Sequence, residues 1–220
     1  MELHRRRFAD ASEQEWGLHH WMQRYVQLKP GSYDGSVDTL DLPGVTIARE
    51  WINVAIEQRV VAPLGRMVFV QPLTTIDDGR INATRIPNGH IVMLHGGEEM
   101  HVSLPADSDM LIVTVDKERL PPEVRRPVPA HIAPGFSAAD VAGTWFLSLL
   151  VSGMAGELTA VPEQSQLLAD LMTDKLAYLF ERILSGGRAL RLRSGADFRL
   201  FQRARELDRK STRLNSSHRT

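Results

Sequence analysis

The sequence predicts an α+β fold in which an antiparallel β-barrel or β-sandwich is followed by two or three α-helices. In residues 23–116, short segments rich in Val, Ile, Thr and aromatic residues alternate with Gly-, Pro-, Asn- and Asp-rich turns, which is typical of antiparallel all-β units. Prolines are concentrated in residues 121–134, and beyond them apolar residues recur at helical spacing. The chain therefore divides into a β-rich part and a helical part.

Six segments have the length and composition of strands, namely residues 45–54, 59–62, 66–72, 80–86, 90–95 and 110–116. The pair Asn88-Gly89 stands between two of them and predicts a hairpin, because this pair accepts the positive φ angles of a type I′ turn. In residues 66–72 both faces are apolar, so the pattern does not decide which face points inward. We expect residues 127–134 to form neither strand nor helix, because proline lacks an amide hydrogen and fixes φ.

Three helices are predicted after the prolines. The first covers residues 137–152, and the second begins at Pro162, which suits a first helical position, and ends before Gly186. A third, over residues 197–209, carries several arginines that we interpret as a solvated face.

The second helix has more apolar surface than one packing face requires. One stripe consists of Leu168, Met172, Leu176, Leu179 and Ile183. We predict that this stripe forms a dimer interface, with packing against the barrel as the alternative.

The composition excludes several classes of function. The 26 basic and 27 acidic residues give a net charge of −1, so the chain lacks the positive charge of a complete DNA-binding domain. It has no cysteine, which excludes disulfides and thiolate catalysis and predicts a cytoplasmic protein. The most apolar run, residues 145–155, is about half of the roughly 20 residues that a membrane span needs, so we expect no membrane anchor.

Five short motifs follow one another along the chain. They are QLKPG at 27–31, VFVQP at 68–72, HGGEEM at 95–100, LIVTVD at 111–116 and FRLFQRAREL at 198–207. With these motifs the chain resembles the N-terminal half of bacterial transcription regulators of the AraC/XylS family. The resemblance implies a cupin-like effector-binding β-barrel over residues 1–120, a proline-rich bridge and helical dimerisation segment over 121–190, and the start of a linker or DNA-binding helix over 191–209.

The resemblance also implies a function. The chain is expected to be the ligand-sensing and dimerisation portion of an AraC-type regulator, which binds a small-molecule effector, pairs as a homodimer and is not an enzyme. The helix-turn-helix DNA-binding domain of that family is missing from this sequence, so contact with DNA would require that domain. Residues 210–220 have no apolar periodicity and resemble the peptide encoded by a translated sequencing adapter, so we expect them to be a non-native tail.

An effector site inside a barrel needs apolar walls and a few polar groups that orient the ligand. Four residues are candidates for this role: Arg49, Trp51, Gln71 and His95. Arg49 and Trp51 share a strand face, and a guanidinium group suits a carboxylate ligand. The alternative is structural, with Trp51 in the core, Arg49 on the rim and Gln71 closing a gap in backbone hydrogen bonding.

A small cupin-type metalloenzyme or isomerase is the alternative function, since His90, His95 and His101 stand near Glu98 and Glu99. The chain has no His-x-His pair, which cupin enzymes typically present, and no nucleophile elbow, phosphate-binding loop or His-Glu-x-x-His motif. We therefore predict no catalytic residue, no metal and no cofactor. A dimerising module without a ligand is the third interpretation.

Overall fold

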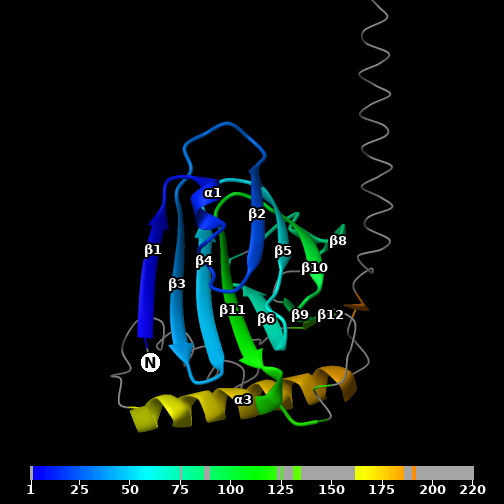
Figure 1. The fold of residues 1–220 in the computed structure, drawn as a ribbon. Coiled ribbons are helices and arrows are strands. Elements are labelled where there is room, and N and C mark those ends of the chain that lie inside the picture. The colour runs from blue at the N-terminus through cyan, green and yellow to red at the C-terminus, as the bar shows by residue number, and fades with distance from the viewer. Residues whose placement is uncertain are drawn as a thin grey trace, which may run out of the picture.

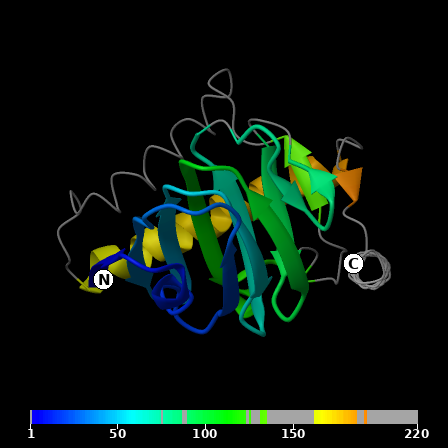
Figure 2. The same ribbon diagram turned by 90° about the horizontal axis from the view of Figure 1, so that it is seen from above.

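A computed structural model describes residues 2–74, 76–86, 90–122, 125, 131–134, 162–185 and 190–191. Two antiparallel sheets face each other, and helix α3 (Pro162–Ser185) crosses the strands of the larger sheet on its outer face (Figures 1 and 2). This arrangement confirms the predicted α+β class, an antiparallel sandwich that precedes a helix. None of the helices in these ranges is both long enough and apolar enough to cross a bilayer.

The strands of the larger sheet follow the order β1-β3-β4-β11-β6-β9-β12-β13, and those of the smaller sheet follow the order β2-β5-β10-β7-β8. The larger sheet comprises β1 (Glu2–Phe8), β3 (Gly35–Leu42), β4 (Val45–Ile52), β11 (Ser108–Asp116), β6 (Arg66–Pro72), β9 (His90–His95), β12 (His131–Pro134) and β13 (Leu190–Arg191). The smaller sheet comprises β2 (Met22–Gln27), β5 (Ile56–Val61), β10 (Glu99–Leu104), β7 (Arg80–Ile81) and β8 (Thr84–Arg85). Two short helices, α1 (Ala11–Gln14) and η1 (Lys117–Arg119), follow β1 and β11.

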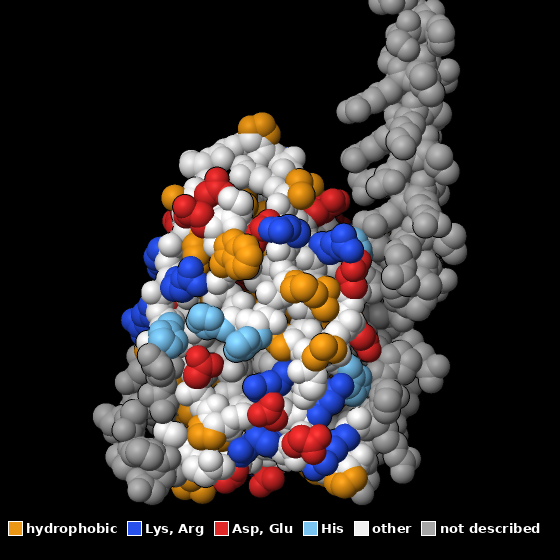
Figure 3. Space-filling view, in the orientation of Figure 1, with side chains coloured by type: hydrophobic (Ala, Val, Ile, Leu, Met, Phe, Trp, Pro, Cys, Tyr) orange, Lys and Arg blue, Asp and Glu red, His pale blue; other side chains and the backbone are white. Residues whose placement is uncertain are grey.

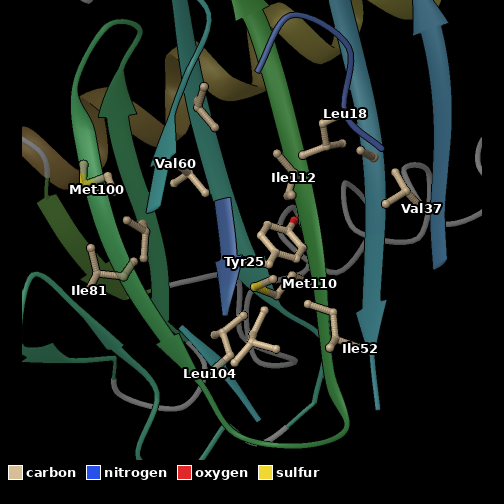
Figure 4. Close-up of a cluster of buried hydrophobic side chains, with 14 of the residues drawn as sticks. Leu18, Tyr25, Val37, Ile52, Val60, Ile81, Met100, Leu104, Met110 and Ile112 are labelled. Atoms are coloured by element: carbon tan, nitrogen blue, oxygen red, sulfur yellow. The ribbon is translucent and has the colours of Figure 1, made fainter. Parts of the chain in front are cut away.

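The larger sheet is buried on both faces. In β4, Ile52 points between the two sheets, whereas Ile47 points toward α3. Figure 4 shows the cluster between the sheets, in which Tyr25 of the smaller sheet lies among apolar side chains such as Ile112 of the larger one. Burial on both faces explains why the central strand β11 is a nearly continuous apolar run. For the same reason its sequence does not show which face points toward the second sheet.

Helix α3 completes the outer layer of the core. Met172 and Leu176 are 0% exposed and pack on the outer face of the larger sheet, with Leu168 partly buried beside them. Arg119 of η1 forms an ion pair with Asp170 of α3. The helix is therefore held to the sandwich both by apolar burial and by a charged contact beside β11.

The structure describes the side chains of three residues of the predicted dimer stripe, and two of these are fully buried within the chain. Met172 and Leu176 pack against the apolar outer face of the larger sheet and so belong to the core of their own chain. Their side chains therefore have no exposed surface that a second copy could contact. The side chains of Leu179 and Ile183 lie outside the described residues. Among the described side chains of α3, the large apolar ones that are exposed are Leu167 and Tyr178, and they offer a second copy a contact surface on that other side of the helix.

Two predicted strands, residues 66–72 and 90–95, coincide with β6 and β9. The predicted hairpin between residues 80–86 and β9 is wrong, because β7 pairs with β8 and β10 in the smaller sheet while β9 pairs with β6 and β12 in the larger one. The tight turn lies earlier, at Asn82 and Ala83, which both have positive φ (47° and 63°). The sequence signal for a two-residue turn was therefore assigned to the wrong pair.

The expectation that residues 127–134 form no strand is also wrong, since β12 pairs with β9 on one side and with β13 on the other. Pro134 is the last residue of β12 and pairs with His90 of β9. A proline at the end of a strand costs little, because it removes a single backbone donor at the last position of the ladder. The helices predicted over residues 137–152 and 197–209, and the tail 210–220, lie outside the described residues.

Candidate ligand site between the sheets

The four residues predicted to line the barrel point away from its interior. Arg49 and Gln71 flank Leu111 in the register of the larger sheet, and His95 pairs with Met67. Leu111 and Met67 belong to the core cluster beneath α3, and directly paired residues share a face. Trp51 lies two residues from Arg49 in β4 and therefore shares its face. The structure thus places the four on the outer face of the sheet without gathering them at one point, which corrects their predicted direction.

Arg49 already has a carboxylate partner. Its Nη2 lies 2.6 Å from Oδ2 of Asp109, and its Nε lies 3.0 Å from Oδ1 of the same residue. These hydrogen bonds raise the pKa of Arg49 above its ordinary value. The guanidinium group that could have received a ligand carboxylate is therefore paired within the chain, on a side chain that is about half exposed.

Between the sheets lies a buried polar network centred on Glu50 of β4, which is 1% exposed. The hydroxyl of Tyr25 in β2 donates to Oε1 of Glu50, and Nε2 of Gln14 in α1 donates to the same oxygen at 3.0 Å. Tyr33 in turn donates to Oε1 of Gln14 at 2.8 Å. Nε2 of Gln23 donates to the hydroxyl of Tyr25 at 2.9 Å. Two side chains thus bond the carboxylate directly, Tyr25 and Gln14, and each is itself hydrogen-bonded to a further polar side chain.

Burial controls the protonation of this network. Removal from water raises the pKa of Glu50, and the hydrogen bonds from Tyr25 and Gln14 lower it in part. Burial and the neighbouring Glu50 raise the pKa of Tyr25 well above its ordinary value. Tyr25 therefore stays protonated and acts as a donor, and the donors that support Glu50 are neutral.

Gly35 of β3 makes room for this network. A Cβ atom at residue 35 would lie 1.9 Å from Oε1 of Gln14, so the side chain of Gln14 passes over the glycine on its way to Glu50. The N-terminal end of α1 is fixed by Asp10, whose Oδ1 accepts from the backbone N–H of Ser12 at 2.7 Å. The position of Gln14 thus depends on a helix cap and on a missing side chain.

Gly35→Ala is expected to lower the free energy of unfolding by about 1–2 kcal/mol, because the added methyl group displaces Gln14 from Glu50. Urea denaturation measures the effect. In the double variant Gly35→Ala, Gln14→Ala the obstruction is gone, so the losses should be less than additive. Additive losses would mean that Gln14 does not occupy the space above Gly35.

A cavity of about 50 Å³ adjoins the network. Its wall is apolar, with side chains such as Leu18, Val60 and Ile112, except where Gln23, Glu50 and Gln58 reach it. Oε1 of Gln23 is buried and has no hydrogen-bond partner in the part of the chain that the structure describes. Apolar walls with a few convergent polar groups are typical of small-molecule sites.

A larger hollow of about 390 Å³ lies next to this cavity on the surface of the sandwich. Trp16, which is 69% exposed, lines it together with Trp21 and the exposed Met22 of edge strand β2. Figure 3 shows hydrophobic side chains among charged ones on this face of the molecule. Trp21 and Gln23 line both spaces, so these two residues stand at the junction between cavity and hollow.

The charged groups of the hollow are paired with one another. Nη1 of Arg24 lies 2.5 Å from Oε2 of Glu15, and Nη2 of Arg59 lies 2.7 Å from Oε2 of Glu99. The Arg59 guanidinium lowers the pKa of Glu99. The two pairs cancel in net charge, so the hollow offers aromatic and apolar surface more than electrostatic attraction.

The sequence contains a signal for the inner site that the predicted set of lining residues leaves out. Glu50 alternates with Ala48 and Ile52, and Gln58 alternates with Ile56 and Val60. A polar residue placed two positions from apolar residues on both sides shares their face in a strand. The predicted set, which began from Arg49, belongs to the other face.

The histidines of the metalloenzyme alternative do not converge. Nε2 of His101 in β10 lies 3.1 Å from Oε1 of Glu99, while His95 lies on the outer face of the other sheet. Across the described ranges, no group of three His, Asp or Glu side chains is arranged to hold a metal ion. The geometry gives this alternative no support.

Replacing Glu50 by glutamine tests the electrostatics of the network. Because burial raises the folded-state pKa above the ordinary value of 4.5, the protonated form stabilises the fold below that pH. This contribution is lost as pH rises through the folded-state pKa. Relative to Glu50→Gln, the wild type should therefore lose stability as the pH rises above 4.5 in urea denaturation. A constant difference as the pH rises would show that Glu50 titrates normally; Glu57→Gln, on the exposed face of β5, is the matched control.

The fold can be compared with solved structures. It is similar to the AraC-like transcriptional activator CuxR, with a TM-score of 0.59 and 13% sequence identity over 87% of this chain and 72% of that chain. A second likeness, to vicilin from hazelnut (Corylus avellana), has a TM-score of 0.27 and 12% identity over 68% of this chain and 44% of that one, and carries no argument. No family model matches the chain. At this identity the first likeness establishes the fold alone.

Proposed function

We propose that this chain is the effector-binding and dimerising part of an AraC-like transcription regulator of the bacterial cytoplasm. It acts by binding and not by catalysis, and DNA is read by a domain outside this sequence. The observation that carries the proposal is the cavity between the sheets, where Gln23, Glu50 and Gln58 face an otherwise apolar wall. The likeness of the fold to an AraC-like activator supports it.

We assign effector binding to residues 1–120 and dimerisation to residues 121–190. Residues 191–209 would begin the connection to the DNA-binding domain, and 210–220 would be non-native. Strand β12 comes from the second segment but joins the larger sheet beside β9, and β13, at the boundary with the third segment, pairs with β12. This shared sheet supports a mechanical connection between the ligand site and the dimerisation segment.

Strand β9 offers a route for that connection. Val92 and Leu94 line the inner cavity, while Ile91 and Met93 of the same strand pack in the cluster beneath α3. A ligand that moves the inner side of β9 must also move its outer side, because the cores on both faces are closely packed. We propose that effector binding shifts α3 in this way and so alters how two copies pair.

A fusion of the full chain to a DNA-binding domain that binds its operator only as a dimer tests the proposal. The fusion should repress a reporter gene, and a small-molecule library should contain compounds that change the repression. The double variant Leu167→Glu, Tyr178→Glu, on the exposed side of α3, should weaken repression without loss of folded protein. A folded fusion that neither represses nor responds to any compound would contradict the proposed function.

A further inference from the structure

The inner cavity has hydrogen-bond acceptors that the chain leaves unused. Tyr25 and Gln14 both donate to Oε1 of Glu50, whereas a carboxylate group accepts about four hydrogen bonds. Oε1 of Gln23, an acceptor, and Nε2 of Gln58, a donor, are both buried without a partner in the described part of the chain. The residues that line the cavity include no Arg, Lys or His. The cavity therefore suits a group that donates hydrogen bonds, and a positive charge would offset that of Glu50.

The size of the cavity limits what it can receive. A volume of about 50 Å³ is close to the space of one or two water molecules, at roughly 30 Å³ each in the liquid. A whole effector of ordinary size needs several times this volume. The cavity therefore suits a small head group, and the rest of the ligand has to lie elsewhere.

The adjoining hollow offers that place. Its volume of about 390 Å³ falls in the range of small-molecule sites, and Trp16, Trp21 and Met22 give it an apolar wall. Trp21 stands where the two spaces meet, and the face of an indole ring attracts a neighbouring cation. An anionic head group would instead meet the carboxylate of Glu50.

From these observations we infer that the effector is a small primary amine with an apolar or aromatic body. Its ammonium group binds Glu50 and Gln23 in the inner cavity, and its body lies against Trp16 and Trp21 in the outer hollow. This inference rests on the proposed function and specifies the chemical class of the effector. The inferred ligand is a cation, whereas Arg49 had suggested an anionic carboxylate ligand.

Calorimetric titration of the full chain tests the inference. The probes are hexylamine, benzylamine and phenethylamine, each with the alcohol and the carboxylate of matched size. The amines should bind at one site per chain, and more tightly than the alcohols, while the carboxylates should bind least. Glu50→Gln should weaken the amines by roughly 10–100-fold, the equivalent of one hydrogen bond to a charged group, and leave the alcohols nearly unchanged.

Two further variants sharpen the result. Trp16→Ala changes an exposed side chain, so the fold should persist, and all aromatic probes should bind more weakly. Glu57→Gln makes the same chemical change as Glu50→Gln at an exposed position of β5 and should leave every affinity unchanged. If Glu50→Gln does not fold, the affinities of the wild type for the amines, compared with those for the carboxylates, still test the amine assignment.

Tighter binding of the carboxylates, or amine affinities unaffected by Glu50→Gln, would overturn the amine assignment while an effector site remained. Failure of the folded wild type to bind any of the amines would also overturn it. The reporter fusion then separates the two proposals. A fusion that responds to another class of compound keeps the regulator function, and one that neither represses nor responds removes both.

Discussion

Leu176→Glu is expected to lower the free energy of unfolding by about 4 kcal/mol. The side chain of Leu176 is fully buried between α3 and the larger sheet. The variant lowers the stability in two ways: it loses the apolar contacts of leucine, and it buries a carboxylate that has no hydrogen-bond partner. Chemical denaturation followed by circular dichroism measures the loss, and the fraction of helix measures whether α3 leaves the sheet.

Leu167→Glu is the matched control on the same helix. Leu167 is 69% exposed, so this change should alter the stability of the monomer by less than about 0.5 kcal/mol. It should act instead on the oligomeric state, as measured by analytical ultracentrifugation. If Leu176→Glu yields stable monomers, its stripe belongs to a dimer interface after all and the core assignment is wrong.

Tyr25→Phe is expected to cost about 3 kcal/mol in free energy of unfolding at a pH where Glu50 is ionised. The hydroxyl of Tyr25 donates to the buried Glu50. A buried carboxylate that loses this donor cannot replace it with water, so the cost of its removal from water is no longer compensated. Tyr33→Phe removes a hydroxyl of the same kind, but that group donates to the neutral Gln14. It should therefore cost only about 1 kcal/mol.

A double-mutant cycle with Glu50→Gln isolates the contact. If Tyr25 stabilises a charged carboxylate, its removal should cost less in the Glu50→Gln background, and the coupling should exceed about 1 kcal/mol. Equal costs for Tyr25→Phe and Tyr33→Phe would mean that Glu50 is protonated in the folded state at the pH of the measurement.

The sequence predicted the architecture well because turn residues and strand composition are local signals. The bounds of β6 and β9 follow directly from their runs of apolar residues between glycines and prolines. Strand pairing is not local, and the predicted partner of residues 80–86 was wrong because the chain turns at Asn82-Ala83, inside the segment predicted as one strand.

The candidate site was harder to predict for a related reason. A sheet with one solvated face shows its inward side by alternation, but here both faces of β4 and β11 carry apolar residues. Arg49 and Glu50 are adjacent polar residues in such a strand, and only the position of α3 decides which of them faces the second sheet. That position is a tertiary property which no single segment encodes.

The edge of the smaller sheet has a consequence for the behaviour of the protein in solution. Strand β2 lies at this edge, and its outward side chains Met22 and Val26 are 67% and 60% exposed. Arg24 stands between them, so the apolar row is interrupted by a charge of the kind that discourages edge-to-edge aggregation. Replacing Arg24 by an apolar residue would leave a continuous apolar row at this open edge, so self-association at high concentration should increase.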